Sequence, residues 1–261
     1  HKYFVPMARA FLAPEANLPI DPYTLGLLIG DGSFRGKTPT FTSMDPELIA
    51  GLVLPGCRLR LNQSTSSGLA FTYSICSGGP HGSPNPLRAR LERLELWGHK
   101  SESKFIPAFY MRASAAQRLA LLQGLLDTDG SACRSGTAEG STSSSQLASD
   151  MRELVESLGG TCSVTRRATR CLPSYRLRIK LQYQMPLFRL ARKQLLIDAA
   201  RPQRREPLRA VTSIEPIGEA KCVCISVDAP DRLYITRHHL LTHNTLPALT
   251  LGTLLGTKRH V

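Results

Sequence analysis

The strongest constraint on the fold of this chain is an internal repeat. Residues 24–33 read TLGLLIGDGS, and residues 122–131 read LQGLLDTDGS. Aligning the two copies pairs Gly26 with Gly124 and Asp31 with Asp129. The repeat predicts two similar halves on one chain, a pseudo-dimer in which each half contains the same helix.

Each copy has the pattern of a helix that ends at an Asp-Gly pair. The first helix is expected to begin at Asp21-Pro22, a capping residue followed by proline at the first helical position. The second is expected to begin at Ser114, where Ser-Ala-Ala-Gln forms a capping box. The glycine after each aspartate suits a left-handed helix cap.

The similarity of the halves continues beyond the motifs. A helix start at Asp45-Pro46 lies about as far behind Asp31 as the expected helix Gln146–Leu158 lies behind Asp129. Hydrophobic alternation predicts strands at Cys57–Asn62, Leu69–Ile75, Thr161–Arg167 and Tyr175–Gln182. Beyond Pro207 the pattern changes to short strands at Ala210–Ile214, Cys222–Val227 and Leu233–Thr236, which predict a separate all-β element.

The charge of the chain indicates a polyanionic partner. Lys and Arg number 33 against 20 Asp and Glu, a net charge of +13. Most of that excess lies between Thr161 and Ala210, where only Asp198 and Glu206 oppose the basic residues. A solvated, solubilising surface would also explain the charge, but its patterning favours nucleic acid.

The pattern is clearest in the segment Tyr175-Arg-Leu-Arg-Ile-Lys-Leu-Gln182. Successive side chains of a strand point to opposite faces, so the apolar residues would pack inward and the polar ones project together. Arg and Gln can read purine edges in the major groove. The segment therefore predicts a DNA-reading surface that includes Arg176, Arg178, Lys180 and Gln182.

The remaining composition excludes several classes of protein. The seven cysteines include no CxxC pair, which indicates reduced thiols in the cytoplasm rather than a disulfide framework or a zinc site. No apolar run approaches the length of a membrane-spanning helix, and the first residues lack the apolar core of a secretion signal.

The repeat also predicts a chemical site. Gly26 and Gly124 would let the two helices cross closely, so that Asp31 and Asp129 lie side by side beneath the basic surface. Two adjacent carboxylates repel each other and need a counter-cation. A hard divalent ion such as Mg²⁺ takes oxygen ligands and phosphate, and it can activate water for phosphodiester displacement.

These paired motifs resemble the LAGLIDADG (dodecapeptide, DOD-type) homing endonucleases, in the two-motif, single-chain form found inside inteins. The resemblance covers roughly residues 20–206 and implies an α+β fold of two αββαββα-like halves with pseudo-two-fold symmetry. It implies that Asp31 and Asp129 are catalytic and hold Mg²⁺, and that Lys104, in Lys104-Phe-Ile-Pro107, is a catalytic lysine. Lys180 and Lys193 are both candidates for its partner in the second half.

The resemblance further implies a monomer that cuts a long double-stranded DNA site in an uninterrupted host gene. The alternative is an inactive DNA-binding or splicing remnant, because degenerate members of the family bind without cutting. The residues expected to contact DNA are Arg58 and Arg60 in the first half and Arg166, Arg167, Arg176, Arg178, Lys180 and Gln182 in the second.

Residues 222–245, CVCISVDAPDRLYITRHHLLTHNT, resemble the C-terminal splicing blocks of an intein, which belong to a Hint domain. Asn244 would cyclise and cut the chain before Thr245, His243 would assist by proton transfer, and Thr245 would accept the joined segment. Cys224 and Thr242 resemble the class 3 inteins, in which this internal cysteine is the first nucleophile. Cys224 can also be read as a small buried strand residue.

These resemblances divide the chain into four expected regions. Residues 1–19 would be a remnant strand of the splicing domain, and residues 20–206 the endonuclease, with halves at about 20–110 and 111–206. Residues 207–244 would be the C-terminal splicing region and residues 245–261 the start of the host protein, with a replicative helicase as a candidate. The N-terminal splicing half is expected to be missing and to act as a partner when supplied.

Overall fold

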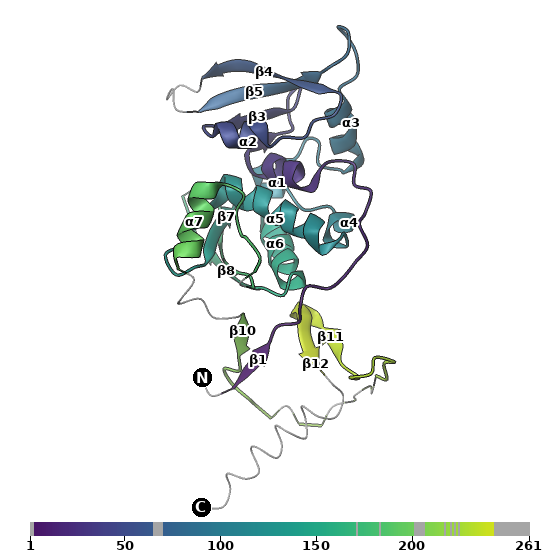
Figure 1. Ribbon diagram of the computed structural model, residues 1–261, viewed down its shortest axis with the longest axis vertical. Helices are drawn as coiled ribbons and strands as arrows, with labels where there is room; N and C mark the ends of the chain where they lie inside the picture. The colour runs from purple at the N-terminus through teal and green to yellow at the C-terminus, as the bar shows by residue number, and fades with distance from the viewer. Residues whose placement is uncertain are drawn as a thin grey trace, which may run out of the picture.

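Two similar halves and a smaller β-rich end make up the computed structural model of the chain (Figure 1). The structure describes residues 3–64, 70–170, 172–182, 184–200, 207–216, 218–219, 221, 223 and 225–242. Each half contains helices and a four-stranded antiparallel sheet, so the expected mixed α and β architecture is confirmed. No helix in these ranges is long and apolar enough to cross a membrane.

The first half begins with α1, which leads directly into its sheet. Its elements are α1 (Pro22–Asp31), β2 (Gly32–Ser33), β3 (Thr40–Ser43), α2 (Pro46–Ala50), β4 (Cys57–Ser64), β5 (Phe71–Ser77) and α3 (Pro86–Arg93). The strands lie in the order β2-β3-β5-β4. The 3₁₀ helix η1 (Ser101–Ser103) and α4 (Ala108–Met111) connect this half to the next.

The second half repeats the same topology. Its sheet order, β6-β7-β9-β8, matches that of the first half position by position. The elements are α5 (Ala115–Asp129), β6 (Gly130–Ala132), β7 (Ala138–Thr142), α6 (Ser145–Ser157), β8 (Thr161–Arg167), β9 (Ser174–Lys180) and α7 (Ala191–Ala199). The predicted repeat is therefore a repeat of structure as well as of sequence.

Local capping explains where the repeated helices begin. The Asp21 carboxylate accepts a hydrogen bond from the Thr24 amide at 2.8 Å, as the sequence predicts. Ser114 and Gln117 form the predicted capping box, with bonds of 3.2 and 3.3 Å. Such caps satisfy amide groups that the first helical turn leaves unpaired.

The predicted left-handed caps at the ends of these helices are wrong. Gly32 and Gly130 have φ of −84° and −100°, which is extended backbone that any residue can adopt. Glycine is needed there for space, because a Cβ at either position would lie closer than 3.0 Å to the carbonyl oxygen of Leu28 or Leu126. In each half, the backbone therefore passes directly from the helix into the following strand without a turn.

Helices α1 and α5 pack against each other at the centre of the molecule (Figure 1). A Cβ added to Gly26 would lie within 3.0 Å of backbone atoms of α5, and one added to Gly124 within 3.0 Å of backbone atoms of α1. Leu25, Leu27, Leu121 and Leu122 are fully buried beside the crossing. The two helices therefore touch backbone to backbone, as predicted.

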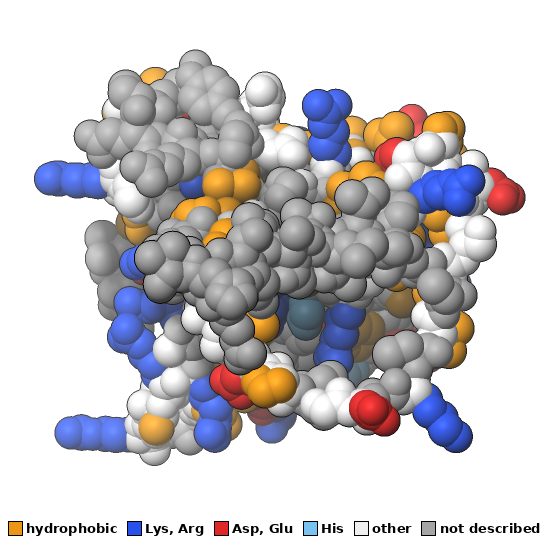
Figure 2. Space-filling view, turned by 90° about the horizontal axis from the view of Figure 1, so that it is seen from below, with side chains coloured by type: hydrophobic (Ala, Val, Ile, Leu, Met, Phe, Trp, Pro, Cys, Tyr) orange, Lys and Arg blue, Asp and Glu red, His pale blue; other side chains and the backbone are white. Residues whose placement is uncertain are grey.

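The β-rich end differs from its prediction. It consists of two small antiparallel sheets, β1 (Phe4–Pro6) with β10 (Leu208–Ala210) and β11 (Tyr234–Thr236) with β12 (Leu240–Thr242). The expected strands at 210–214 and 222–227 are not found among the described residues there, where Ile214, Val223 and Ile225 remain exposed. β propensity produces a strand only where a neighbouring strand pairs with it. Seen from this end (Figure 2), Lys and Arg side chains project around the rim.

We predict that Gly124→Ala destabilises the protein by about 2 kcal/mol or more, because an added methyl group would meet backbone atoms that cannot rotate away. Helix propensity alone favours alanine by about 1 kcal/mol, so a net loss would report the steric cost. Urea unfolding followed by circular dichroism measures the difference. Gly36→Ala is the control, because its nearest neighbour, the Thr38 carbonyl oxygen, would lie at 3.5 Å.

Candidate active site

The helix crossing brings Asp31 and Asp129 into one surface depression of about 530 Å³. The two aspartates are the last residues of α1 and α5, and Lys104 lines the same depression. Ser141, Thr142 and Ser143, from the end of β7 and the residue that follows it, contribute polar side chains to the wall. The three residues predicted from the paired motifs thus share one site.

Lys104 holds the end of α1 through backbone carbonyl groups. Its ammonium group donates to the oxygens of Ile29 at 2.6 Å and Gly32 at 2.7 Å. The oxygens of Gly30 and Leu28 lie at 3.3 and 3.4 Å. Lys104 is only 4% exposed, so these carbonyl groups replace the water that would otherwise surround its charge.

Lys193 makes the equivalent contacts at the end of α5. Its ammonium group donates to the oxygens of Asp127 and Gly130 at 2.7 Å and of Leu126 at 3.1 Å. In the aligned repeat these three residues correspond to Ile29, Gly32 and Leu28. The geometry therefore makes Lys193 the counterpart of Lys104, a choice that the sequence left open. Lys180, the other candidate, ends β9 opposite Thr161.

The charges of the site perturb one another. Burial, and then the charge of Asp129, raise the pKa of Asp31 to about 6. Burial also raises the pKa of Asp129, while Lys104 and Lys193 lower it. Burial lowers the pKa of Lys104 to about 8 against the opposite effect of Asp129 and Asp31. Such mutual shifts are typical of sites at which charge is to be bound or moved.

The donor set suits a hard divalent cation. The carboxylates of half-buried Asp31 and of the more exposed Asp129 line one open depression, and each has a raised pKa that a bound cation would lower. Nowhere in the described ranges, this site included, could a group of three or more His, Cys, Asp or Glu hold a metal ion, so the site offers two carboxylates. Mg²⁺ in proteins is commonly held by one or two carboxylates, with water and substrate phosphate as the other ligands.

Asp127 lies two residues before Asp129 in α5 but has a structural role. Its carboxylate accepts hydrogen bonds from the Tyr23 hydroxyl at 2.8 Å, the Arg189 amide at 3.0 Å and the Leu190 amide at 3.3 Å. These bonds fix the start of α7, the helix that carries Lys193. Ile29 occupies the equivalent position in the first half, so only one half has this acid.

The exposed face of the second sheet carries four of the six DNA-contacting residues predicted in the second half. Arg176 and Arg178 are exposed, while Leu177 and Ile179, which follow them, are fully buried, which confirms the predicted alternation. In the ladder, Thr161 lies opposite Lys180 and Thr165 lies opposite Arg176. Arg167 is two residues after Thr165 in β8, so it lies on the same face as Arg176. Glu139, which the sequence analysis missed, lies 3.0 Å from Arg178 and 3.8 Å from Arg176.

The other two predicted residues of the second half lie elsewhere. Arg166 pairs with Tyr175 and therefore belongs to the opposite face of the sheet from Arg167. Strand β9 ends at Lys180, and the Gln182 amide lies beside the backbone of Gly159. The alternation of the sequence could not show where the strand stops. In the first half, Arg58 and Arg60 line a separate hollow of about 620 Å³ with Lys37 and Arg88.

The splicing residues are described only in part. Thr242 is the last residue of β12 and pairs with Tyr234. Cys224, His243, Asn244 and Thr245 lie outside the described residues. The hairpin formed by β11 and β12 is attached to the second half through His238, whose ring lies 3.2 Å from the Glu156 carboxylate.

Comparison with known protein families gives a match in the second half of the chain. The family described as a LAGLIDADG-like domain matches residues 116–183, from α5 through β9. The match includes Asp129 and the basic face of the second sheet.

The chain is also similar to part of a larger protein. The replicative DNA helicase DnaB of Mycobacterium intracellulare is 30% identical over 251 residues, which are 94% of this chain. The chain spans 38% of the length of that helicase.

Solved structures show a more distant likeness. I-DmoI in complex with DNA and Mn has a TM-score of 0.43 and 14% identity, over 62% of this chain and 89% of that chain. Mesophilic variants of the homing endonuclease I-DmoI have a TM-score of 0.43 and 13% identity, over 71% of this chain and 97% of that chain.

We predict that Asp31→Asn is more stable than the wild type at pH 7.5 by about 1–2 kcal/mol, after allowance for solvent screening. The folded pKa of Asp31 is raised to about 6, so the folded state binds the proton more tightly than the unfolded state does. Wild-type stability from this group is therefore present below pH about 4 and is lost as the pH rises towards 6.

Urea unfolding at pH 4, 5, 6 and 7.5 measures this difference. It should grow with pH and shrink again when Mg²⁺ is added, because only the wild type keeps both carboxylates. Glu47→Gln, an exposed carboxylate on α2, is the control. A variant that is less stable than the wild type at every pH would contradict the cost assigned to the buried charge.

Proposed function

We propose that this chain is a site-specific double-strand DNA endonuclease that acts as a monomer with two pseudo-symmetric halves. The proposal depends mainly on one observation: two aspartates and two lysines meet where the halves join. Asp31 and Asp129 end the central helices, and Lys104 and Lys193 bind equivalent carbonyl groups beside them. A duplex has two scissile phosphates, so a site with paired groups suits the cutting of both strands.

Asp31 and Asp129 would hold a divalent cation, for which Mg²⁺ is the natural candidate. When bound, such an ion activates water and stabilises the charge that develops on the phosphate. The protein's own groups hold the reacting phosphate in place. Lys104 and Lys193 keep the two carboxylate-bearing helix ends in fixed positions. Their positive charge offsets the negative charge of the approaching phosphates.

The basic faces of the two sheets would bind the duplex on either side of this site. Arg176, Arg178 and Arg167 project from the second sheet, and Arg58 and Arg60 from the first. Phosphate contacts supply salt-dependent affinity, whereas arginine side chains that reach base edges supply sequence discrimination. Glu139 between Arg176 and Arg178 would orient the two guanidinium groups.

The similarity to a DnaB helicase supplies a candidate substrate. We propose that the chain is part of an intein inserted in a replicative helicase, and that its target is the uninterrupted helicase gene in the cytoplasm. The extent of the match is consistent with an insert, because 94% of this chain aligns with 38% of the helicase.

We predict that the protein cuts DNA carrying the uninterrupted helicase site in the presence of Mg²⁺. Asp31→Asn and Asp129→Asn should each reduce cutting by about 100-fold or more while largely preserving binding, because each loses a carboxylate from the cation site. Lys104→Met and Lys193→Met should each lose the cutting of one strand. Plasmid cleavage and gel-shift measurements on the same variants separate the two properties.

Lys180→Met is the matched control, because Lys180 lies on the DNA-facing sheet and away from the helix ends. It should weaken binding modestly and cut normally at saturating protein. Binding by the wild type without any cutting would support an inactive DNA-binding member of the family. If the aspartate variants keep both cutting and binding, Asp31 and Asp129 are excluded as catalytic residues.

We also propose that residues 222–245 form a C-terminal splicing junction. The side-chain amide nitrogen of Asn244 would attack its own carbonyl carbon, which breaks the bond to Thr245 and forms a succinimide. The proton lost by the amide would pass to the departing amine of Thr245, with His243 as the carrier. Cys224 would be the first nucleophile, in the manner of class 3 inteins, and Thr242 would precede the junction at the end of β12.

We predict that supplying an N-terminal splicing half causes release of residues 245–261, and that Asn244→Ala blocks the release. Cyclisation needs reacting atoms held in near-attack geometry, an effect that can contribute about 7–11 kcal/mol. Intact-mass spectrometry of the incubated protein detects the loss directly. If the mass of the full chain persists with every splicing half tried, only the endonuclease proposal survives.

A further inference from the structure

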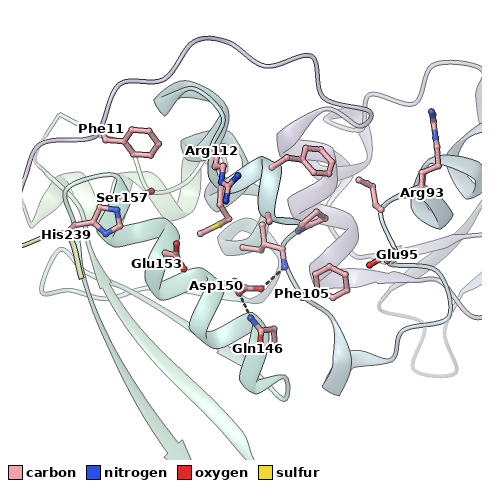
Figure 3. Close-up of a pocket in the computed structure, with 16 residues that line it drawn as sticks. Phe11, Arg93, Glu95, Phe105, Arg112, Gln146, Asp150, Glu153, Ser157 and His239 are labelled. Atoms are coloured by element: carbon pink, nitrogen blue, oxygen red, sulfur yellow. Dashed lines mark hydrogen bonds between the residues drawn. The ribbon is translucent and has the colours of Figure 1, made fainter. Parts of the chain in front are cut away.

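The segment that carries Lys104 is held by the opposite half of the molecule. The Ser144 hydroxyl donates to the Lys104 carbonyl oxygen at 2.7 Å and accepts a bond from the Leu147 amide at 3.1 Å. Ser144 is fully buried and caps α6. The Ile106 amide, two residues further on, donates to the Asp150 carboxylate at 2.8 Å (Figure 3). Lys104 therefore has its backbone fixed by the second half and its ammonium group bound to the first.

A related contact exists on the other side of the pseudo-two-fold axis. Asp45 precedes α2 as Ser144 precedes α6, so the two residues occupy equivalent caps in the two halves. The Asp45 carboxylate forms an ion pair with Arg192, the neighbour of Lys193. Asp45 makes no side-chain capping bond to its own helix. The described contact of its carboxylate is thus with the segment that carries the second lysine.

We propose that Ser144 and Asp45 are positioning residues, each of which fixes the lysine-bearing segment of the opposite half at the cleavage site. The inference rests on the proposed endonuclease function and deepens it. Each lysine then takes its place from both halves, so a shift of one half against the other moves the lysines relative to the aspartates. A displacement of about 1 Å can reduce the rate of a reaction by roughly 100-fold.

The two contacts differ in strength. Removing the Ser144 hydroxyl would leave the Lys104 carbonyl group without this buried partner, and an unsatisfied buried group is costly. The Asp45–Arg192 pair is more open, with side-chain exposures of 24% and 52%. Pairs exposed to solvent are weak and are screened by salt. Loss of Ser144 should therefore have the larger effect, and loss of Asp45 an effect that depends on salt.

The test follows the two DNA strands separately on a plasmid with one target site. Ser144→Ala should slow the cutting of one strand by about tenfold or more, and that strand should be the one left intact by Lys104→Met. Asp45→Ala should slow the other strand several-fold at low salt, matching Lys193→Met, and differ less from the wild type at high salt. Nicked plasmid would accumulate with both Ser144→Ala and Asp45→Ala, and the nick would lie in opposite strands in the two cases.

Matched variants separate positioning from a general loss of structure. Ser149→Ala removes an exposed hydroxyl from α6, and Glu47→Ala removes an exposed carboxylate two residues from Asp45, so both should cut like the wild type. Ser144→Thr keeps the hydroxyl and should restore cutting. Asp45→Arg combined with Arg192→Asp should restore the second strand. Equal slowing of both strands in Ser144→Ala or in Asp45→Ala would overturn the proposal.

A second measurement does not depend on DNA cleavage. Brief treatment with an amine-acetylating reagent, followed by peptide mass spectrometry, reports the exposure of each lysine. Ser144→Ala should increase acetylation at Lys104 but not at Lys193, and Asp45→Ala should do the reverse. If the wild type proves unable to cut DNA, the proposed function fails while this result still decides the positioning roles. Unchanged or equal acetylation at both lysines would contradict them.

Discussion

The contact between Gly26 of α1 and Gly124 of α5 determines where every group of the candidate site lies. With hydrogen in place of a side chain at both positions, the two helices approach until their backbones touch. Their last residues then share one depression, although they are 98 positions apart in the sequence. The packing is not symmetric one turn later, because a Cβ at Gly30 would collide with the side chain of its neighbour Thr128. The two halves are therefore similar without being interchangeable.

Bringing two helix ends together creates an electrostatic cost that the lysines offset. The C-terminal end of a helix carries partial negative charge, and here each end also carries an aspartate. Lys104 and Lys193 donate to the terminal carbonyl groups of α1 and α5 and lower the pKa of Asp129. They would be needed to assemble the site even if they had no part in the reaction. The same ammonium charge thus stabilises the helix end and influences the ionisation of the aspartates.

The sequence predicted the features that depend on local pattern. The helix starts at Asp21 and Ser114 and the alternating face of Arg176 and Arg178 follow from capping and strand periodicity, and the structure confirms them. It could not predict contacts that arise only when the halves pack. Lys193 lies at a comparable distance behind its Asp-Gly motif as Lys104 does, so the repeat contained a weak signal for it.

The wrong predictions also have physical reasons. Gly32 and Gly130 fit the composition of a left-handed cap, but a close carbonyl group, which is invisible in the sequence, is what requires them to be glycine. Gln182 continued the alternation beyond the end of the strand that produced it. In the β-rich end, a strand pattern such as Ala210–Ile214 had no way to show whether a partner strand would be present.

Helix α6 connects the two chemical regions that the sequence analysis distinguished. Its first turn, at Ser144, fixes the segment of Lys104. Its last turn carries Glu156, which binds Arg152, Arg209 and His238, and the hydrogen bonds from Arg152 and Arg209 outweigh burial and lower the pKa of Glu156. A helix of 13 residues spans about 20 Å and transmits displacement at one end to the other. The hairpin that ends at Thr242 therefore contacts the same helix as the segment that carries Lys104.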